Sequence, residues 1–288
     1  MSQASSSPPA PRAVLKFGGE VVADPRALAT VLGEVAGLVR SGWRFALCHG
    51  GGPQANSLQS RLGLETVKVG GRRVTDEPTL QVMKQVLAGE VSVDVTAAAN
   101  LAGLQAVGIS GVSAGLVTAS RRPPMVVSGG GSEPVDFGLV GRVDRIETGL
   151  VEHLWEGGYT PVINTLGVEP GASDEQGRAL VYNINADTVA SELAASLGVE
   201  HLFLMTGVPG VLRDKDDPST RLARLTAAEA RDAIESGVIV GGMIPKVEEA
   251  LDQLEKGIGA VHILGGGEGV LAAEARDPGS RGTVLLRA

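Results

Sequence analysis

The sequence contains few of the residues that define several common protein classes. Its 288 residues include a single cysteine, which excludes a disulfide framework and a zinc site built from cysteines. Aromatic residues make up only 3%, too few for the stacking platforms that hold single-stranded nucleic acid. The net charge of −8 also argues against a nucleic-acid partner, because binding to phosphate backbones depends on basic surfaces. No targeting segment or membrane-spanning apolar run is evident, so we expect a soluble, cytoplasmic protein with no membrane partner.

Several nucleotide-binding and hydrolytic motifs are also missing. The chain contains no Gly-Lys dipeptide, which argues against a P-loop, and no Gly-x-Gly-x-x-Gly follows a predicted strand, which disfavours a Rossmann site. His-Glu-x-x-His, a zinc-protease motif, does not occur. The four histidines, His49, His153, His201 and His262, are scattered along the chain, so we expect no resident metal site.

A regular alternation of strand and helix patterns runs through the sequence. Buried, β-rich runs occur at 13–17, 45–48, 104–109, 160–164, 201–205, 260–264 and 283–286. Helical patterns occur at 25–41, 75–101, 148–156, 187–197, 226–236 and 243–256. This alternation indicates an α/β fold, and we predict a three-layer α/β/α sandwich with a mostly parallel central sheet. Residues 110–147 read as a hairpin region and 166–180 as Gly-rich turns.

The composition also suggests where the chain divides. Residues 1–12 are rich in serine and proline and predict a disordered tail. Glycine, proline and acidic residues cluster near 166–180, so we expect two lobes, an N-lobe at 13–170 and a C-lobe at 171–288. The 41 glycines are about twice the usual share, which indicates many tight turns or close backbone approaches.

Lys16 is the first candidate functional residue. It is one of only six lysines, against nineteen arginines, and it lies in a buried strand directly before Gly18 and Gly19. An ammonium group is costly in that position unless it has an anionic partner. Either Lys16 sits on an edge strand and extends to solvent, or it points at phosphate oxygens with glycine amides beside it.

A second glycine-rich turn follows the second strand. In His49-Gly50-Gly51-Gly52-Pro53, three glycines let backbone N–H groups approach an anion at a helix N-terminus. The same sequence is compatible with a plain strand-to-helix turn. His49 is compatible with general base catalysis, but its imidazole can equally cap the loop.

Three further segments carry charged or amide side chains at helix starts. Arg73, in Gly71-Arg72-Arg73, is placed to clamp a carboxylate, although an arginine pair is often only solvated, as we expect for Arg121-Arg122. Asn183 and Asp187 precede and begin a helix, which they could merely cap. Lys246 follows Gly241-Gly242 at a helix N-terminus, where a cation opposes the helix dipole unless an anion binds. Together these groups suit phosphoryl transfer without a P-loop.

The order and spacing of these motifs resemble the amino acid kinase family, and within it the acetylglutamate kinases. The matching segments are Lys-Phe-Gly-Gly, His-Gly-Gly-Gly-Pro, Gly-Arg-Arg-Val-Thr-Asp, Ile-Asn-Ala-Asp-Thr-Val-Ala, Val-Pro-Gly-Val-Leu and Gly-Gly-Met-Ile-Pro-Lys-Val. The resemblance spans about residues 13–286. It implies the amino acid kinase fold and ATP-dependent phosphorylation of the γ-carboxylate of N-acetyl-L-glutamate, a step of arginine biosynthesis. It implies Mg²⁺ carried by ATP rather than by a dedicated metal site.

The resemblance also implies roles for individual residues. Lys16 and Lys246 look like the lysines that stabilise the transition state, and Asp187 like the residue that holds both. The substrate-binding residues it implies are Gly51, Gly52, Arg73 and Asn183. The phosphate- and nucleotide-binding residues it implies are Gly18, Gly19, Thr206, Gly207, Gly210, Leu212, Gly241, Gly242 and Met243. The N-lobe is expected to bind the amino acid and mediate dimerisation, and the C-lobe to bind the nucleotide.

Three positions depart from the family pattern. Thr206-Gly207-Val208 stands where the family usually has Thr-Asp-Val, which removes a carboxylate near the nucleotide. Gly265-Gly266-Gly267 replaces an Asp-Gly-Arg stretch, and Arg72 replaces a leucine, which adds a cation near the amino acid pocket. A related kinase that acts on acetyl-aminoadipate, or a weakened ligand sensor, therefore remains an alternative. Because residues 1–12 cannot form the helix that links arginine-inhibited members into rings, we expect a homodimer without strong arginine feedback.

Overall fold

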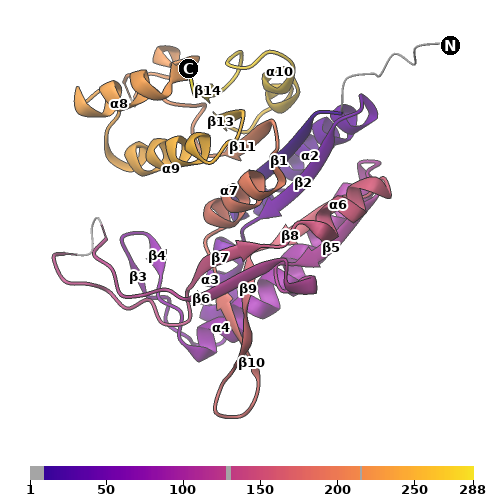
Figure 1. Ribbon diagram of the computed structural model, residues 1–288, viewed down its shortest axis with the longest axis vertical. Coiled ribbons are helices and arrows are strands. Elements are labelled where there is room, and N and C mark those ends of the chain that lie inside the picture. The colour runs from indigo at the N-terminus through magenta and orange to yellow at the C-terminus, as the bar shows by residue number, and fades with distance from the viewer. Residues whose placement is uncertain (1–9, 128–130, 215) are drawn as a thin grey trace.

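The computed structural model of the protein describes residues 10–127, 131–214 and 216–288 (Figure 1). Most of the predicted disordered tail, residues 1–9, lies outside the described residues. Arg12 already belongs to the first strand, β1 (Arg12–Phe17). No helix in the described ranges combines the length and apolar character needed to cross a bilayer.

A mostly parallel, eight-stranded sheet forms the centre of the molecule. Its spatial order is β12-β14-β13-β11-β1-β2-β8-β5, and only the β13–β14 pair is antiparallel. After β1, its strands are β2 (Arg44–His49), β5 (Ala106–Ser110), β8 (Thr160–Asn164), β11 (His201–Met205), β12 (Arg224–Thr226), β13 (Ala260–Leu264) and β14 (Thr283–Leu286). The strands predicted from the sequence are all present, within two residues at each end.

The first strand occupies the place where the strand order changes direction. From β1 the chain adds β2, β8 and β5 on one side, and β11, β13, β14 and β12 on the other. Lys16 is therefore on an interior strand that is hydrogen-bonded to β2 and to β11. Ligands of such sheets bind beyond the carboxyl ends of the strands at this switch point.

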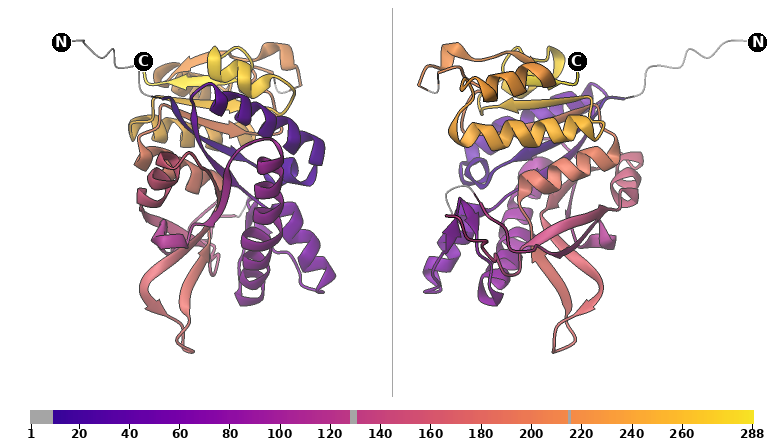
Figure 2. Two further views of the ribbon diagram at one scale, coloured as in Figure 1. Left: turned by 90° about the vertical axis from the view of Figure 1, so that its right-hand side faces the viewer. Right: turned by 60° about the vertical axis from the view of Figure 1, so that its left-hand side comes forward.

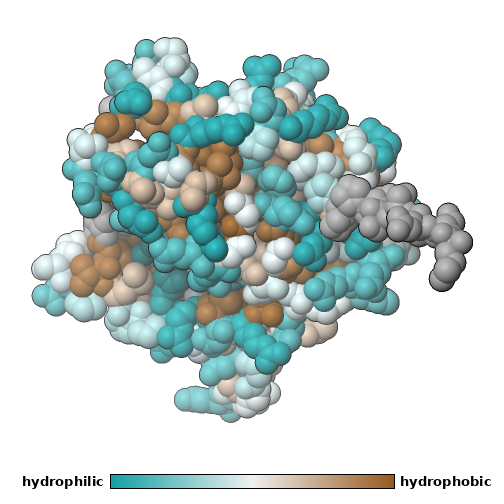
Figure 3. Space-filling model, turned by 45° about the horizontal axis from the view of Figure 1, so that its top comes forward, coloured by the Kyte–Doolittle hydropathy of each residue, from teal (hydrophilic) through white to brown (hydrophobic). Residues whose placement is uncertain are grey.

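Helices cover both faces of the sheet, which confirms the predicted three-layer sandwich (Figure 2). One face packs against α6 (Gly149–Glu156), α7 (Ala186–Leu197), α8 (Ala227–Glu235) and α9 (Ile244–Glu255). The other face packs against α2 (Pro25–Arg40), α5 (Ser92–Leu101) and α10 (Val270–Arg276). The strands are buried on both sides, as continuous apolar runs in a parallel sheet require. On the face shown in Figure 3, hydrophobic residues lie in small patches among hydrophilic ones.

A second, four-stranded sheet corrects one prediction. Residues 166–180, which read as turns, contain β9 (Leu166–Ser173) and the start of β10 (Ala179–Asn183). These strands form an antiparallel hairpin that projects from the body of the protein (Figure 1). Its tip turns because the Asp174 carboxylate accepts hydrogen bonds from the N–H groups of Gln176 and Arg178, both 2.9 Å. The hairpin joins β6 (Val117–Arg121) and β7 (Gly141–Ile146), the antiparallel pair predicted within 110–147.

The predicted helix at 75–101 has an irregular middle. It comprises α4 (Glu77–Lys84), a π-helical stretch η1 (Gln85–Val91) and α5. π-Helical segments are rare and often lie at functional sites, and Leu87 of η1 lines the cleft described below. The remaining elements are α1 (Gly19–Ala23), α3 (Gly52–Arg61), β3 (Lys68–Val69), β4 (Arg72–Arg73), η2 (Ser113–Gly115), η3 (Pro218–Thr220) and η4 (Gly241–Met243).

Candidate active site

A cleft of about 610 Å³ opens beyond the carboxyl end of β1. It is lined by the glycine loops after β1 and β2, the β3–β4 hairpin, the start of α7 and one side of α9. Eight residues predicted from the sequence line it together: Lys16, Gly18, Gly19, Gly51, Gly52, Arg73, Asn183 and Asp187. These residues come from positions as far apart as 16 and 187. The fold therefore brings into one cleft residues that the sequence identified only as separate segments.

Lys16 is buried at the base of this cleft and has an anionic partner. Its side chain is only 11% exposed, and its Nζ lies 2.8 Å from Oδ1 of Asp187. Asp187 is in the first turn of α7, where the Asn185 side chain caps the helix by accepting the Asp187 N–H at 2.7 Å. The edge-strand interpretation of Lys16 is wrong because β1 is an interior strand. The ion pair offsets the cost of burying the ammonium group.

The two glycine loops touch each other beside Lys16. A Cβ atom on Gly19 would lie 2.6 Å from Pro53 Cδ and 3.0 Å from the Gly52 backbone nitrogen. A Cβ on Gly51 would lie 2.9 Å from a methyl group of Leu87. Gly51 caps α3 without a side-chain hydrogen bond, so the first N–H groups of that helix have no side-chain acceptor there. At Gly52 a Cβ would meet no atom within 4 Å, so the start of this helix leaves room for an anion.

His49 supports the loop rather than facing the cleft. Its ring is fully buried, and its Nδ1–H donates to the Gly50 carbonyl oxygen at 3.1 Å. Burial lowers the pKa of His49 to about 4, against a smaller opposing effect of the bond to Gly50. His49 is also absent from the cleft lining. The structure therefore favours the loop-capping interpretation over general base catalysis.

Arg73 is held in the cleft by neutral groups. Its guanidinium donates to Gln59 Oε1, to Asn56 Oδ1 at 2.5 Å and to the Gly52 carbonyl oxygen at 3.3 Å, all on α3. Burial lowers its pKa from the usual value, although the group stays charged. Within the described residues it has no carboxylate partner. Such a fixed cation without a counterion is suited to binding a carboxylate from outside. The sequence did not identify Asn56 or Gln59, although their spacing places both on one side of α3.

Arg122 corrects a second prediction. We expected Arg121-Arg122 to be solvated, and Arg121 does form a surface ion pair with Asp136 at 2.8 Å. Arg122 instead lines the cleft with Arg72. The two guanidinium groups both contact Met125 Sδ, at 3.5 and 3.9 Å. The Nε atom of Arg122 is buried and has no hydrogen-bond acceptor among the described residues.

Lys246 and Glu249 lie one turn apart on α9. Glu249 lines the cleft, and the charges of Lys246, Lys16 and Asp187 all act on it. Lys246 does not line the cleft, and among the described residues it forms no ion pair. The predicted contact of Asp187 with both lysines is thus present for Lys16, and the contact with Lys246 stays a prediction.

The loop after β11 carries most of the residues predicted to bind nucleotide. Thr206 fixes its start, since its hydroxyl donates to the Val208 carbonyl oxygen at 2.9 Å. A Cβ on Gly210 would lie 2.6 Å from Thr283 Oγ1, and this oxygen accepts the Val211 N–H at 2.8 Å. Around Gly207 there is open space. Thr206, Gly207, Gly210, Leu212, Gly241 and Met243 do not line the cleft, so their nucleotide contacts, like that of Gly242, stay predictions.

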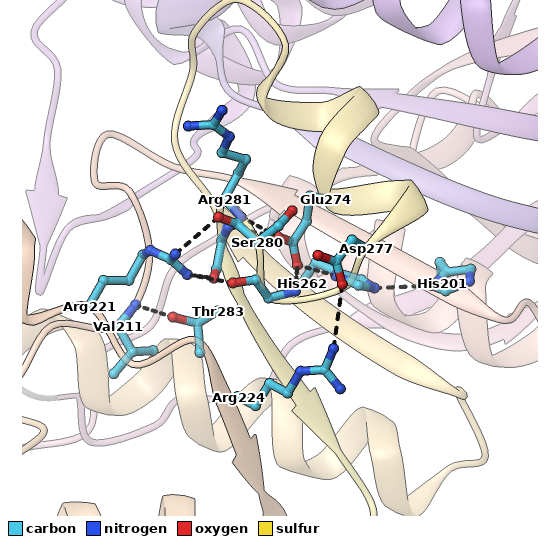
Figure 4. Close-up of polar contacts among 12 residues, drawn as sticks. His201, Val211, Arg221, Arg224, His262, Glu274, Asp277, Ser280, Arg281 and Thr283 are labelled. Carbon is cyan, nitrogen blue, oxygen red and sulfur yellow. Dashed lines mark hydrogen bonds and ion pairs between the residues drawn. The ribbon is translucent and has the colours of Figure 1, made fainter.

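A buried polar network supports this loop from behind (Figure 4). Glu274 of α10 accepts hydrogen bonds from the backbone N–H groups of residues 279, 281 and 282 and from His262 Nδ1 at 2.8 Å. His262 in turn contacts His201 at 3.0 Å. Burial alone would raise the pKa of Glu274, but these hydrogen bonds lower it to about 2. The network holds the turn that leads into Thr283, and Thr283 contacts the loop after β11.

Comparison with known proteins decides the family. A model described as the amino acid kinase family matches residues 11–265. The chain belongs to the amino acid kinase family. It is 49% identical over 291 residues to an acetylglutamate kinase of Sorangium cellulosum (strain So ce56), a match that covers 99% of this chain and 100% of that protein. It is 50% identical to an acetylglutamate kinase of Anaeromyxobacter dehalogenans (strain 2CP-C), over 94% of this chain and 98% of the relative.

Solved structures of the amino acid kinase fold resemble the chain as well. The N-acetylglutamate synthase of Neisseria gonorrhoeae superposes with a TM-score of 0.77 at 24% identity, and the match covers 97% of this chain but 60% of the synthase. The carbamate kinase of Giardia lamblia superposes with a TM-score of 0.68 at 16% identity, over 96% of this chain and 99% of that one. These likenesses confirm the predicted fold.

Proposed function

We propose that this member of the amino acid kinase family transfers the γ-phosphoryl group of ATP to the γ-carboxylate of N-acetyl-L-glutamate, forming N-acetyl-glutamyl phosphate for arginine biosynthesis. The observation that carries the proposal is one cleft with two separate cationic groups. Arg73 offers an unpaired guanidinium to one carboxylate of the substrate, and Lys16 lies at the base of the same cleft for the reacting groups. Relatives at about half identity over nearly the whole chain carry the matching name.

The acceptor needs no general base. A glutamate γ-carboxylate has a pKa near 4.3, so it is already ionised at neutral pH. The buried, neutral His49 is consistent with chemistry that has no proton to remove. The difficulty is to bring two anions together, and Lys16 and Lys246 reduce their repulsion by neutralising charge as it spreads in the transition state.

The glycine loops fit the phosphates of a nucleotide. Gly19, Gly51 and Gly52 line the cleft without side chains, so backbone N–H groups can come close to phosphate oxygens there. When bound, ATP supplies the phosphoryl group, and its Mg²⁺ screens the phosphate charge. The described residues contain no group of three or more metal-ligating side chains, so we place Mg²⁺ on the nucleotide. The loop at 206–212 and η4 hold the base and ribose.

A coupled ADP-release assay with N-acetyl-L-glutamate tests the function. We expect turnover that depends on both ATP and N-acetyl-L-glutamate, and a higher kcat/KM than with N-acetyl-L-aminoadipate. The two acids differ by one methylene group, which is worth about 1–3 kcal/mol of discrimination. The ratio of their kcat/KM values can resolve a difference of that size. A higher kcat/KM for the aminoadipate would reassign the substrate. Binding of both ligands without ADP release would instead indicate a sensor.

We also propose the assembly and lobe division that the sequence suggested. On α5, next to the edge strand β5, Val93 and Leu101 are 62% and 90% exposed, although both are large apolar residues. Exposed apolar side chains on one helix support pairing with a second copy. The N-lobe, 13–170, then binds the amino acid and the C-lobe, 171–288, the nucleotide. Light scattering tests the dimer, and a hexamer inhibited by micromolar arginine would contradict it.

A further inference from the structure

The two walls of the cleft carry opposite charge. On one wall, the β3–β4 hairpin and the segment after β6 contribute Arg72 and Arg122 beside the Arg73 clamp. On the other wall, helix α9 contributes Glu248, Glu249 and Asp252. The cleft therefore contains two guanidinium groups, those of Arg72 and Arg122, in addition to the one on Arg73 that is proposed to bind the substrate carboxylate.

Glu249 is the most buried charge on the acidic wall and it has no fixed partner. It lines the same cleft as Lys16, Asp187, Arg72 and Arg122, and the charges of these residues and of Lys246 act on it or on its arginine neighbours. Among the described residues none of these cations comes within ion-pair distance of it. Among the described residues, Met125 Sδ is the side-chain acceptor that both Arg72 and Arg122 contact, and the Arg122 Nε has no acceptor there. The half-buried carboxyl group of Glu249 and the guanidinium groups of Arg72 and Arg122 thus form no ion pair among the described residues.

Glu249 and Lys246 move together because they share a helix. Three residues apart, they project from the same side of α9. A force that draws Glu249 across the cleft also brings Lys246 toward the substrate. The N-terminal turn of α9 follows directly after η4, whose Gly241 has a positive φ of 58°, so the connection contains a residue with unusual backbone freedom.

We propose that Glu249 is a positioning residue: it pairs with Arg72 and Arg122 when the substrates are bound, and this cross-cleft pairing sets Lys246 over the reacting groups. The inference rests on the proposed kinase function. It explains why this chain carries Arg72 where the family pattern has leucine, because the extra cation faces the carboxylate on the opposite wall. Arg73 remains free for the substrate carboxylate.

Steady-state kinetics of charge-removed variants test the pairing. We expect Glu249→Gln to lower kcat about tenfold while both KM values change less than about threefold, because Lys246 acts mainly in the transition state. The double variant Arg72→Gln/Arg122→Gln should lower kcat by a similar factor. The triple variant should have a kcat no lower than that of Glu249→Gln or of the double arginine variant. The matched control is Glu255→Gln on the exposed end of α9, which should leave kcat unchanged. An unchanged kcat in Glu249→Gln, or independent multiplying effects of the two sets, would overturn the proposal.

The pH profile separates this role from a purely structural one. Burial and the Asp187 charge raise the pKa of Glu249 to about 7, although Lys16, Lys246 and Arg72 oppose the shift. The pairing needs the ionised form, so kcat/KM, which reports the free enzyme, should fall as pH drops through about 7. Glu249→Gln should lose this limb of the profile, whereas Glu249→Asp should retain it with a reduced kcat. The same acid limb in wild type and Glu249→Gln would contradict the assignment.

A distance measurement tests the pairing without turnover. Because Cys48 is buried, spin labels will react selectively at Val67→Cys and Glu255→Cys, two exposed positions, one directly before β3 and one at the end of α9. With a non-hydrolysable ATP analogue, Mg²⁺ and N-acetyl-L-glutamate, the label distance should shorten, and it should shorten less in the Glu249→Gln background. An equal distance change in both backgrounds would refute the pairing. No turnover by the wild type would refute the kinase function, while the distance comparison would still decide the role of Glu249.

Discussion

The ammonium group of Lys16 and the carboxylate of Asp187 lie 2.8 Å apart and join the central strand to the first turn of α7. One partner comes from the beginning of the sequence and the other from beyond its midpoint. Lys16 is nearly buried, while Asp187 retains some exposure to the cleft. The pair therefore fixes the direction of the lysine side chain before any ligand arrives, which is the preorganisation that electrostatic catalysis requires.

Removing either charge of this pair should stop catalysis for different reasons. We expect Lys16→Met to lower kcat about 100- to 1000-fold with a folded protein, because it removes a cation from the transition state. Asp187→Asn should lower kcat and also the free energy of unfolding, since it leaves Lys16 partly buried without a counterion. Kinetics and urea denaturation of both variants measure these effects. Near-normal turnover in Lys16→Met would show that the mechanism is misassigned.

Arg73 should affect substrate binding more than the chemical step. Arg73→Ala removes a charged hydrogen-bond donor held by Asn56 and Gln59, so KM for N-acetyl-L-glutamate should rise about 10- to 100-fold. KM for ATP should change little. Arg121→Ala is the matched control, because Arg121 pairs with Asp136 on the surface. A larger fall in kcat than rise in KM would place Arg73 at the reacting phosphoryl group instead.

Gly207 offers a gain-of-function test of the nucleotide loop. The space around it is open, so Gly207→Asp can restore the carboxylate usual in the family without a collision. An acceptor at this position can bind hydroxyl or amino groups of the nucleotide, and we expect KM for ATP to fall roughly tenfold. Gly207→Asn is the control for charge. An unchanged KM for ATP in both variants would remove this loop from the nucleotide site.

Gly210, three residues later, should tolerate no side chain. Its φ is 152°, and a Cβ at this position would approach Thr283 Oγ1 to 2.6 Å, so both the backbone and the packing oppose alanine. We expect Gly210→Ala to lower the free energy of unfolding by about 1–3 kcal/mol. Gly207→Ala, in the same loop but in open space, should change it by less than about 0.5 kcal/mol. Chemical denaturation of the two variants makes the comparison, and equal stabilities would contradict this close packing of Gly210 on Thr283.

Glu274 should make the stability of the protein depend on acid pH. Its folded-state pKa of about 2 lies below the unfolded value near 4.3, so its contribution is fully present above pH 4.3. That contribution, roughly 3 kcal/mol, is lost as pH falls toward 2. Glu274→Gln should be less stable at pH 7 and should lose stability less steeply between pH 5 and about 2. Parallel curves for the two proteins would show that the hydrogen bonds to Glu274 contribute no charge-dependent stability.

The sequence was most informative where one physical requirement dominates. Continuous apolar runs specify strands buried on both faces, so the central sheet was predictable. Lys16 could be identified because a charged side chain in a buried apolar run needs a partner of opposite charge. Asp187 could be identified because it lies at the start of a predicted helix. The β9–β10 hairpin was missed because its glycines and acidic residues are also typical of turns. Its two strands form by pairing with each other, and β9 also pairs with β6.

Other site residues gave no local signal. Gln59 and Asn56 are ordinary helix-surface residues until Arg73 folds against them. Arg122 reads as a solvated loop residue, and Glu249 as one of several acids on an amphipathic helix. Their significance depends on which residues face them across the cleft, and that is determined by tertiary packing rather than by spacing along the chain.

The strand β1 is tied to neighbours along both of its edges, whereas α9 is attached to the sheet through side chains alone. Of the two lysines proposed to act on the phosphoryl group, Lys16 is thus held in a strand that is hydrogen-bonded on both edges, whereas Lys246 is carried on a helix outside the sheet. An inhibitor bound between α9 and the rest of the cleft would therefore hold the ammonium group of Lys246 away from the substrates without displacing that of Lys16.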